Sequence, residues 1–222
     1  MSKVAVVRFP GTNNEYETIR ALKSFNIDAQ LVESFETNKI KEYDAFWLAG
    51  GFSYGDVLRA GAIASASDFM RELKGTSVPI IGSCNGFQIL TETNMLPGAL
   101  LPNKTTRFIS KWIRLKVVES NSFLDSIQGQ IIKIPIAHFE GNYYHPDVTQ
   151  VKNQVSFKYC NEKGETTIEA NPNGSLDNIA GIVDAKKSII GLMPHPERAS
   201  FAHQGSTDGR LIIESFLKEV KQ

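Results

Sequence analysis

The stretch Gly82-Ser83-Cys84-Asn85-Gly86 decides the fold, because it joins a short apolar run at residues 78–81 to a segment with helical character at residues 87–90. A cysteine flanked by glycines at a strand-to-helix junction is the cysteine form of a nucleophile elbow. The turn is sharp, so a side chain larger than hydrogen would clash on either side. We therefore expect the Cys84 sulfur to project over a helix N-terminus, where the helix dipole and free N–H groups favour the thiolate.

The composition is that of an ordinary globular protein. The 222 residues suit one domain, residues 1–222, with ample length for a core. Lys plus Arg and Asp plus Glu both total 24, which gives no support for nucleic acid or an anionic membrane as a partner. No apolar stretch approaches the roughly 20 residues needed to span a bilayer. Two cysteines make no disulfide framework, so we expect a soluble, cytoplasmic protein.

The first half of the chain alternates short apolar segments with helical patterns. Strands are expected at residues 3–9, 30–32, 45–49 and 78–82. Residues 12–15, Thr-Asn-Asn-Glu, fit a capping box at the start of a helix, and a second helix is expected over much of residues 57–73. This alternation predicts an α/β fold, a flavodoxin-like open and mostly parallel sheet with helices on both faces. In such sheets the functional crevice lies at the carboxyl ends of the strands.

The second half changes character. Strand-like segments with short connections occur at residues 108–118, 131–136, 155–159 and 179–183, and a final strand is expected at residues 188–193. These predict a small antiparallel extension of the sheet or a side sheet. A closing helix is expected at residues 208–220.

One histidine has a setting that suits catalysis beside Cys84. His195 lies in Met193-Pro194-His195-Pro196-Glu197-Arg198, directly after the expected final strand. The prolines stiffen this loop. In an extended turn, Glu197 would project to the same side as His195 and hold its ring, which predicts a Cys-His-Glu triad.

A glycine-rich segment after the third strand offers backbone donors. It reads Gly50-Gly51-Phe52-Ser53-Tyr54-Gly55-Asp56. Glycines let backbone N–H groups approach a ligand closely. With the Asn85 N–H at the elbow, the N–H of Gly51 or Phe52 is expected to form an oxyanion hole, and each such donor is worth roughly 3–4 kcal/mol in acyl transfer.

Structural explanations compete with each of these interpretations. A buried cysteine usually serves as a small hydrophobic residue, and His195 alone would more often be structural. The joint occurrence of these residues, each directly after an expected strand, favours catalysis. Cys160 precedes a turn and is interpreted as a bystander, and the histidines and cysteines lack zinc-type spacing, so no metal is expected.

At this point the sequence resembles a known family. Gly-Ser-Cys-Asn-Gly-Phe-Gln at 82–88 and Pro-His-Pro-Glu at 194–197 resemble the class I (triad-type) glutamine amidotransferases. Residues 8–13, 50–56, 58–62 and 205–210 are most similar to glutaminase subunits of purine biosynthesis. The resemblance implies that Cys84 attacks the glutamine carboxamide, His195 transfers protons and Glu197 orients His195. It implies that Gly51 and Asn85 support the oxyanion and that Gln88 binds glutamine.

The resemblance also implies partners. Glutamine hydrolysis would supply ammonia to an ATP-dependent reaction, and the chain has no Gly-x-x-x-x-Gly-Lys-Ser/Thr phosphate loop. We therefore expect no cofactor here, with ATP and Mg²⁺ on a large synthase subunit assembled with a small accessory subunit. Residues 137–143 depart from the family pattern, which usually has glycine at Phe139 and a basic residue at Asn142. The roles of His138 and Asn142 stay unassigned.

Two alternatives stay open from the sequence. The first is another cysteine hydrolase of the same fold, such as a protease or deglycase, against which Gln88 and the Tyr54-Gly55-Asp56 segment argue. The second is a non-catalytic interaction module, against which the presence of all three triad residue types argues.

Overall fold

A computed structural model describes residues 2–118 and 124–220 of the chain. Its centre is a sheet that, among these residues, has nine strands in the order β2-β1-β3-β4-β11-β10-β9-β6-β7. The first five in that order are parallel: β2 (Asp28–Glu33), β1 (Lys3–Arg8), β3 (Ala45–Leu48), β4 (Ile80–Ser83) and β11 (Ile189–Leu192). The predicted flavodoxin-like α/β fold is confirmed.

The antiparallel part continues the same sheet, and its four strands coincide with the four strand-like segments expected in the second half. It consists of β10 (Ile179–Asp184), β9 (Val155–Cys160), β6 (Ile109–Val117) and β7 (Ile131–His138). A separate antiparallel pair, β5 (Ala99–Pro102) with β8 (Glu140–Tyr144), lies beside it. A side sheet was one of the two arrangements expected, but these two segments were not predicted as its strands.

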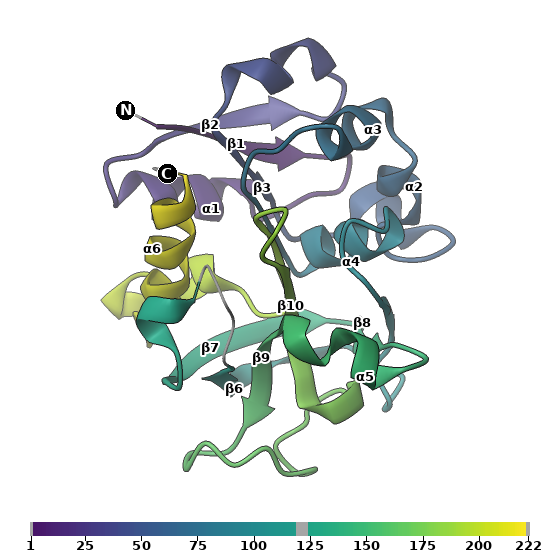
Figure 1. The fold of residues 1–222 in the computed structure, drawn as a ribbon, viewed down its shortest axis with the longest axis vertical. Helices are drawn as coiled ribbons and strands as arrows, with labels where there is room; N and C mark the ends of the chain where they lie inside the picture. The colour runs from purple at the N-terminus through teal and green to yellow at the C-terminus, as the bar shows by residue number, and fades with distance from the viewer. Residues whose placement is uncertain (1, 119–123, 221–222) are drawn as a thin grey trace.

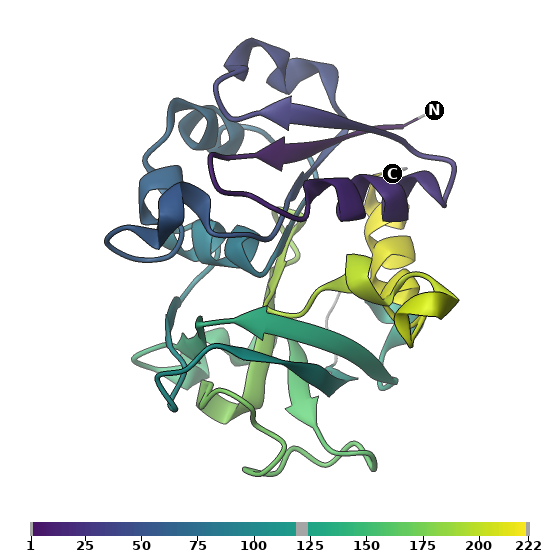
Figure 2. The same ribbon diagram turned by 180° about the vertical axis from the view of Figure 1, so that it is seen from behind.

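Helices cover both faces of the parallel strands (Figures 1 and 2). On one face, α1 (Glu15–Lys23) and α6 (Gly209–Glu219) pack on apolar residues such as Val4, Trp47 and Ile81. On the other, α2 (Ala62–Ser65), α3 (Asp68–Lys74) and α4 (Asn85–Glu92) pack on alternate residues such as Val7 and Phe46. A short helix, α5 (Val148–Val151), lies near the antiparallel strands. The alternation of side chains along each strand thus gives two apolar layers.

The helix expected over residues 57–73 is wrong in its extent. Residues 53–58 form an irregular loop with positive φ at Tyr54, Asp56 and Leu58, and two short helices follow. Gly61 enters α2 in the left-handed region, at φ +81°. Ser67 then starts α3 anew, because its hydroxyl accepts a hydrogen bond from the Met70 N–H.

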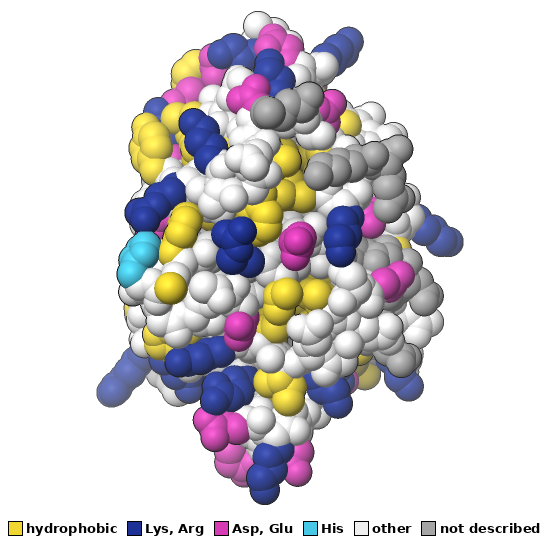
Figure 3. Space-filling view, turned by 90° about the vertical axis from the view of Figure 1, so that its left-hand side faces the viewer, with side chains coloured by type: hydrophobic (Ala, Val, Ile, Leu, Met, Phe, Trp, Pro, Cys, Tyr) yellow, Lys and Arg dark blue, Asp and Glu magenta, His cyan; other side chains and the backbone are white. Residues whose placement is uncertain are grey.

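The surface agrees with the balanced composition. On the side of the molecule that carries α1 and α6, basic and acidic side chains are interspersed among small apolar patches (Figure 3). Within residues 2–118 and 124–220, every helix is too short or too polar to span a lipid bilayer.

Candidate active site

The elbow has the strained geometry that the sequence predicts. Cys84 joins β4 to α4 with φ +53° and ψ −108°, a conformation that costs a non-glycine residue free energy and persists at functional sites. A Cβ on Gly82 would lie 2.6 Å from the Gly86 backbone, and one on Gly86 would lie 2.0 Å from Leu48 O. The expected steric need for both glycines is therefore confirmed.

Strand order brings His195 next to the elbow. β11 pairs in parallel with β4, so that Leu192 lies opposite Ser83, and the Cys84 N–H donates to Leu192 O at 2.8 Å. The chain leaving β11 therefore passes beside Cys84 before it reaches His195. This arrangement joins two segments that are more than a hundred residues apart.

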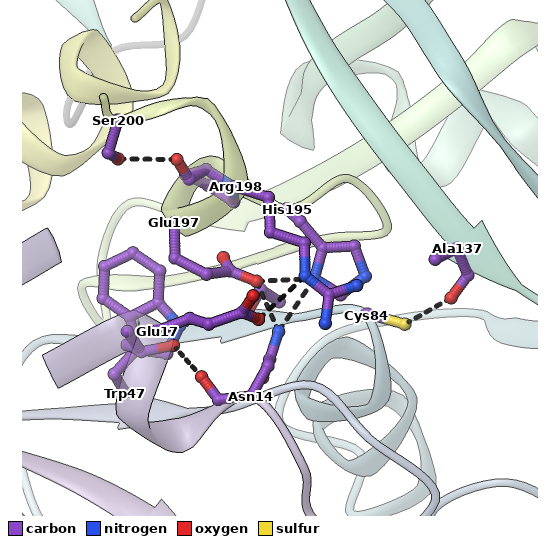
Figure 4. A network of polar contacts seen from close by, with 12 residues as sticks. Asn14, Glu17, Trp47, Cys84, Ala137, His195, Glu197, Arg198 and Ser200 are labelled. Carbon is purple, nitrogen blue, oxygen red and sulfur yellow. Dashed lines mark hydrogen bonds and ion pairs between the residues drawn. The ribbon is translucent and has the colours of Figure 1, made fainter. Parts of the chain in front are cut away.

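His195 and Glu197 form a buried pair (Figure 4). Nδ1 of His195 lies 2.5 Å from Oε1 of Glu197, and the two residues are 2% and 0% exposed. The predicted contact is confirmed, although Pro196–Ala199 forms a 3₁₀ turn where an extended one was expected. The turn is fixed by Ser200, whose hydroxyl donates to Pro196 O at 2.8 Å.

The electrostatics of this pair favour a protonated ring. Burial alone disfavours the charged imidazole, but the charges of Glu197 and Cys84 outweigh burial and raise the pKa of His195 to about 10. Figure 4 shows the His195 ring between Glu197 and Cys84. Nε2 of His195 is buried and, among the described residues, has no hydrogen-bond partner, which leaves the N–H of the protonated ring available to a substrate atom.

Cys84 itself is enclosed. It is 4% exposed, and its Sγ lies 3.6 Å from the carbonyl oxygen of Ala137 in β7. The first N–H group of α4, that of Asn85, has no hydrogen-bond partner in the part of the chain that the structure describes. This N–H therefore remains a candidate oxyanion donor at the elbow, as the sequence predicts.

The glycine-rich loop supplies one of its two candidate donors. Gly51 has φ +150°, and a Cβ there would lie 2.7 Å from the Asn13 N, so the loop packs closely on the chain after β1. The Gly51 N–H makes no hydrogen bond with any described residue. The Phe52 N–H, in contrast, donates to Gly11 O at 2.9 Å. The prediction that the Phe52 N–H binds an oxyanion is therefore withdrawn, because this N–H is already hydrogen-bonded within the protein.

A chain of amide groups connects this loop to the elbow helix. The Ser53 N–H donates to Asn85 Oδ1 at 3.2 Å, and Asn85 Nδ2 donates to Gln88 Oε1 at 2.8 Å. Gln88 Nε2 in turn donates to Glu140 O at 2.6 Å. Gln88 is thus buried and already bonded at both ends of its amide, so its contact with glutamine stays a prediction.

Negative charge borders this amide chain. Burial, together with the neighbouring Glu140 carboxylate, raises the pKa of Asp56 to about 6. The Glu140 carboxylate accepts a hydrogen bond from the Ala60 N–H at 3.1 Å. The Asp56 and Glu140 carboxylates are therefore close enough to affect each other, and Gln88 is bonded to the Glu140 backbone.

Two buried side chains near the site were missed or left unassigned by sequence reasoning. Asn14 Nδ2 contacts both Glu197 Oε1 and His195 Nδ1, whereas the sequence places it in a capping box. That capping box is wrong: the Thr12 hydroxyl accepts from the Phe9 N–H, and α1 has no side-chain cap.

His138 is 2% exposed, and burial and nearby His195 lower its pKa to about 3, so its ring is neutral. The one sequence signal for Asn14 is its place just after β1, at the carboxyl edge of the sheet.

Comparisons with known proteins identify the family. Residues 1–212 match the model of a CobB/CobQ-like glutamine amidotransferase domain. The chain is 47% identical to phosphoribosylformylglycinamidine synthase subunit PurQ of Pyrococcus horikoshii and 43% identical to that of Aquifex aeolicus, covering 100% and 98% of this chain and 100% of each relative. The chain belongs to the PurQ family of glutamine amidotransferases. A structure of PurLQS from Thermotoga maritima matches with TM-score 0.87 and 35% identity, over 98% of both chains.

The departures of this PurQ-family chain from the expected motif lie at the border of the site. Phe139 is 40% exposed, and Asn142 Nδ2 lies 3.4 Å from Pro102 O. His138 Nδ1 contacts Asn103 Oδ1 at 3.0 Å. The Asn103 amide donates to two carbonyl groups, those of Arg107 and His138, which fixes its oxygen toward the His138 ring. His138 therefore carries its proton on Nδ1.

Proposed function

We propose that this PurQ-family chain is the glutaminase subunit of a phosphoribosylformylglycinamidine synthase, and that Cys84, His195 and Glu197 are its catalytic triad. The observation that carries the proposal is the strained Cys84 beside a buried His195 whose Nδ1 lies 2.5 Å from Glu197 Oε1. We also propose that residues 1–222 form one amidotransferase domain. The continuous sheet supports this, because it contains strands from both halves of the chain.

The reaction follows from the positions of these groups. His195 Nε2 accepts the thiol proton, and the Cys84 thiolate attacks the carbonyl carbon of the glutamine side chain. The N–H groups of Asn85 and Gly51 bind the oxyanion of the tetrahedral intermediate. His195 then donates its proton to the leaving nitrogen, which departs as ammonia and leaves a glutamyl thioester. Water attacks the thioester while His195 accepts its proton, and glutamate is released.

Glu197→Gln tests the orienting carboxylate. A raised pKa means that His195 keeps its proton as the pH rises to about 10, and part of this stabilisation comes from the Glu197 charge. Glu197→Gln should therefore lower kcat/KM about 10²- to 10⁴-fold, the upper value being that of the equivalent change in a serine protease. The alkaline limb of the pH–kcat/KM profile should move to lower pH. An unchanged alkaline limb would contradict the role given to Glu197.

The product ammonia is proposed to pass to a partner. The relatives are named as subunits of a synthase, which supports a division of labour between chains. We place ATP and Mg²⁺ on a large synthase subunit, with a small accessory subunit in the complex and the whole assembly in the cytoplasm. A protein interface that excludes water would keep ammonia unprotonated during transfer.

Partner binding is expected to activate the site. Cys84 and His195 are 4% and 2% exposed, so glutamine needs an opening that this structure does not offer. Large apolar side chains in the segments next to the site are exposed, and Leu58 in the loop after β3 is 86% exposed. Adding the synthase should raise kcat/KM for glutamine about 5- to 150-fold, the usual range of a coupling free energy. Leu58→Asp should weaken activation, whereas Ile168→Asp, at an apolar position elsewhere that is 77% exposed, should not.

Two measurements test the whole proposal. The chain is copurified with a candidate synthase, and glutamate release is assayed with and without it. Cys84 is then labelled with a glutamine analogue that carries an electrophile. A chain that turns over peptides but not glutamine would support the alternative hydrolase. If Cys84 stays unlabelled with the synthase present, the glutaminase function is wrong. An isolated chain working at the full rate of the complex would refute only the activation.

A further inference from the structure

Helix α1 begins after Asn14 without a hydrogen bond between the Asn14 side chain and its first turn. Asn14 precedes Glu15, and asparagine at this position normally accepts a stabilising hydrogen bond from the first turn. Here the Asn14 side chain makes no such bond. The backbone holds the helix start, because the Thr18 N–H donates to Asn14 O at 3.1 Å. The Asn14 side chain is thus free to serve elsewhere.

That side chain reaches the buried histidine–glutamate pair. Asn14 is 1% exposed, its Nδ2 donates to Glu197 Oε1, and the same nitrogen lies 3.0 Å from His195 Nδ1. A ring nitrogen that binds a carboxylate carries the proton, so His195 Nδ1 is a donor as well. Asn14 and His195 therefore donate to one carboxylate oxygen from two sides (Figure 4).

The orientation of the amide is determined by Glu197. Turning the amide over would place Asn14 Oδ1 against Glu197 Oε1, and two acceptors repel each other. In the observed orientation Asn14 Oδ1 is buried and, among the described residues, has no partner. A buried acceptor without a partner destabilises the folded protein. The protein thus leaves a helix uncapped and an oxygen unpaired at one residue, a departure from local rules that is typical of functional sites.

The neighbouring backbone is shaped to this contact. A Cβ on Gly50 would lie 2.9 Å from His195 Cε1 and 3.0 Å from Asn14 Nδ2, so the end of β3 packs on both groups. Glu197 is 0% exposed, and its Oε2 has no partner among the described residues. The orientation of the carboxylate therefore depends on Asn14 and His195.

We propose that Asn14 is a positioning residue of the triad, whose amide holds Glu197 Oε1 in line with His195 Nδ1 and so fixes the tautomer and the direction of the ring. The inference rests on the proposed glutaminase function and deepens it. Asn14 touches neither substrate nor sulfur in this role, because it acts through Glu197.

Asn14→Leu removes the donor at similar volume and is tested in the chain bound to its synthase. The kcat/KM for glutamine should fall roughly 10- to 100-fold, as when the outer partner of a metal-bound histidine is removed. The loss should be mainly in kcat, and the alkaline limb should move to lower pH in the same direction as for Glu197→Gln. The control is Asn13→Ala, at the exposed preceding residue, which should leave rate and pH profile unchanged.

A double variant separates positioning from folding. In the Glu197→Gln background, Asn14→Leu should have little further effect, because residues that act through one another are not additive. A loss that is additive, with no movement of the alkaline limb, would overturn the proposal in favour of a structural role.

Asn14→Asp covers the case in which Asn14→Leu fails to fold. Two neighbouring carboxylates share a proton more readily as the pH falls, and the protonated group can donate as the amide does. Activity relative to wild type should therefore increase toward low pH, and a constant ratio would refute the idea. If the wild-type complex has no glutaminase activity, the proposed function itself is wrong. If the wild-type complex is active and the Asn14 variants are equally active, only this inference is wrong.

Discussion

Cys84→Ala should abolish glutamine hydrolysis, lowering kcat by about 10⁴-fold or more, as when the nucleophile of a protease triad is removed. Alanine keeps the fold of the turn while removing the sulfur, so no thioester can form and His195 has no thiol proton to accept. The measurement is glutamate release by the complex, followed under single-turnover conditions. Binding of glutamine should persist, because the groups at Asn85 and Gly51 are untouched.

Cys160 provides the matched control for this experiment. It is 5% exposed in β9, away from the elbow, and burial raises the pKa of its thiol, which makes it a poor nucleophile. Cys160→Ala should keep full glutaminase activity and full labelling of Cys84 by a glutamine-analogue electrophile. Residual glutaminase activity of Cys84→Ala above a few per cent would exclude Cys84 as the nucleophile.

Gly86→Ala should have the largest effect on stability. The added Cβ would lie 2.0 Å from Leu48 O, and Leu48 belongs to β3, which is held on both sides by β1 and β4. The strand cannot move, so α4 must shift away and take Cys84 with it. We expect a loss of about 3 kcal/mol or more in the free energy of unfolding, at the upper end for overpacking. Urea unfolding measures the loss, and glutaminase activity should fall with it.

Gly129→Ala is the control for a glycine that has no crowded neighbour. Its φ is +74°, and no atom of residues 2–118 or 124–220 lies within 4 Å of an added Cβ. Only the backbone strain of a left-handed conformation should appear, about 1–2 kcal/mol. Equal losses for the two variants would show that the close approach of α4 to β3 does not limit stability.

The sequence predicted the parts of this protein that depend on neighbouring residues. The glycines around Cys84 indicated a sharp turn, because local backbone geometry allows few alternatives there. The two-residue spacing of His195 and Glu197 indicated a contact, which forms through a 3₁₀ turn in place of the extended one expected. The alternation of strands and helices in the first half predicted the parallel sheet with both faces covered. These predictions needed no knowledge of distant segments.

The predictions that were wrong involve competition between alternative hydrogen-bond partners. Residues 12–15 fit a capping box, but the Thr12 hydroxyl accepts from the Phe9 N–H instead of the first turn of α1. The Asn14 amide contacts Glu197, which is 183 residues away. The Phe52 N–H was predicted as an oxyanion donor, but in the structure it donates to Gly11 O. A local sequence pattern indicates which hydrogen bonds a residue can make, and the tertiary packing determines which of them forms.

The sequence by itself determined the candidate nucleophile, its strained turn and the chemical types of the residues proposed to act with it, since these follow from residue identity and short-range sterics. Only the tertiary structure decided that β11 lies beside β4, which brings His195 to Cys84, and that Asn14 faces Glu197. Strand order and the choice among hydrogen-bond partners depend on contacts between segments far apart in the chain, and such contacts carry no local periodic signal.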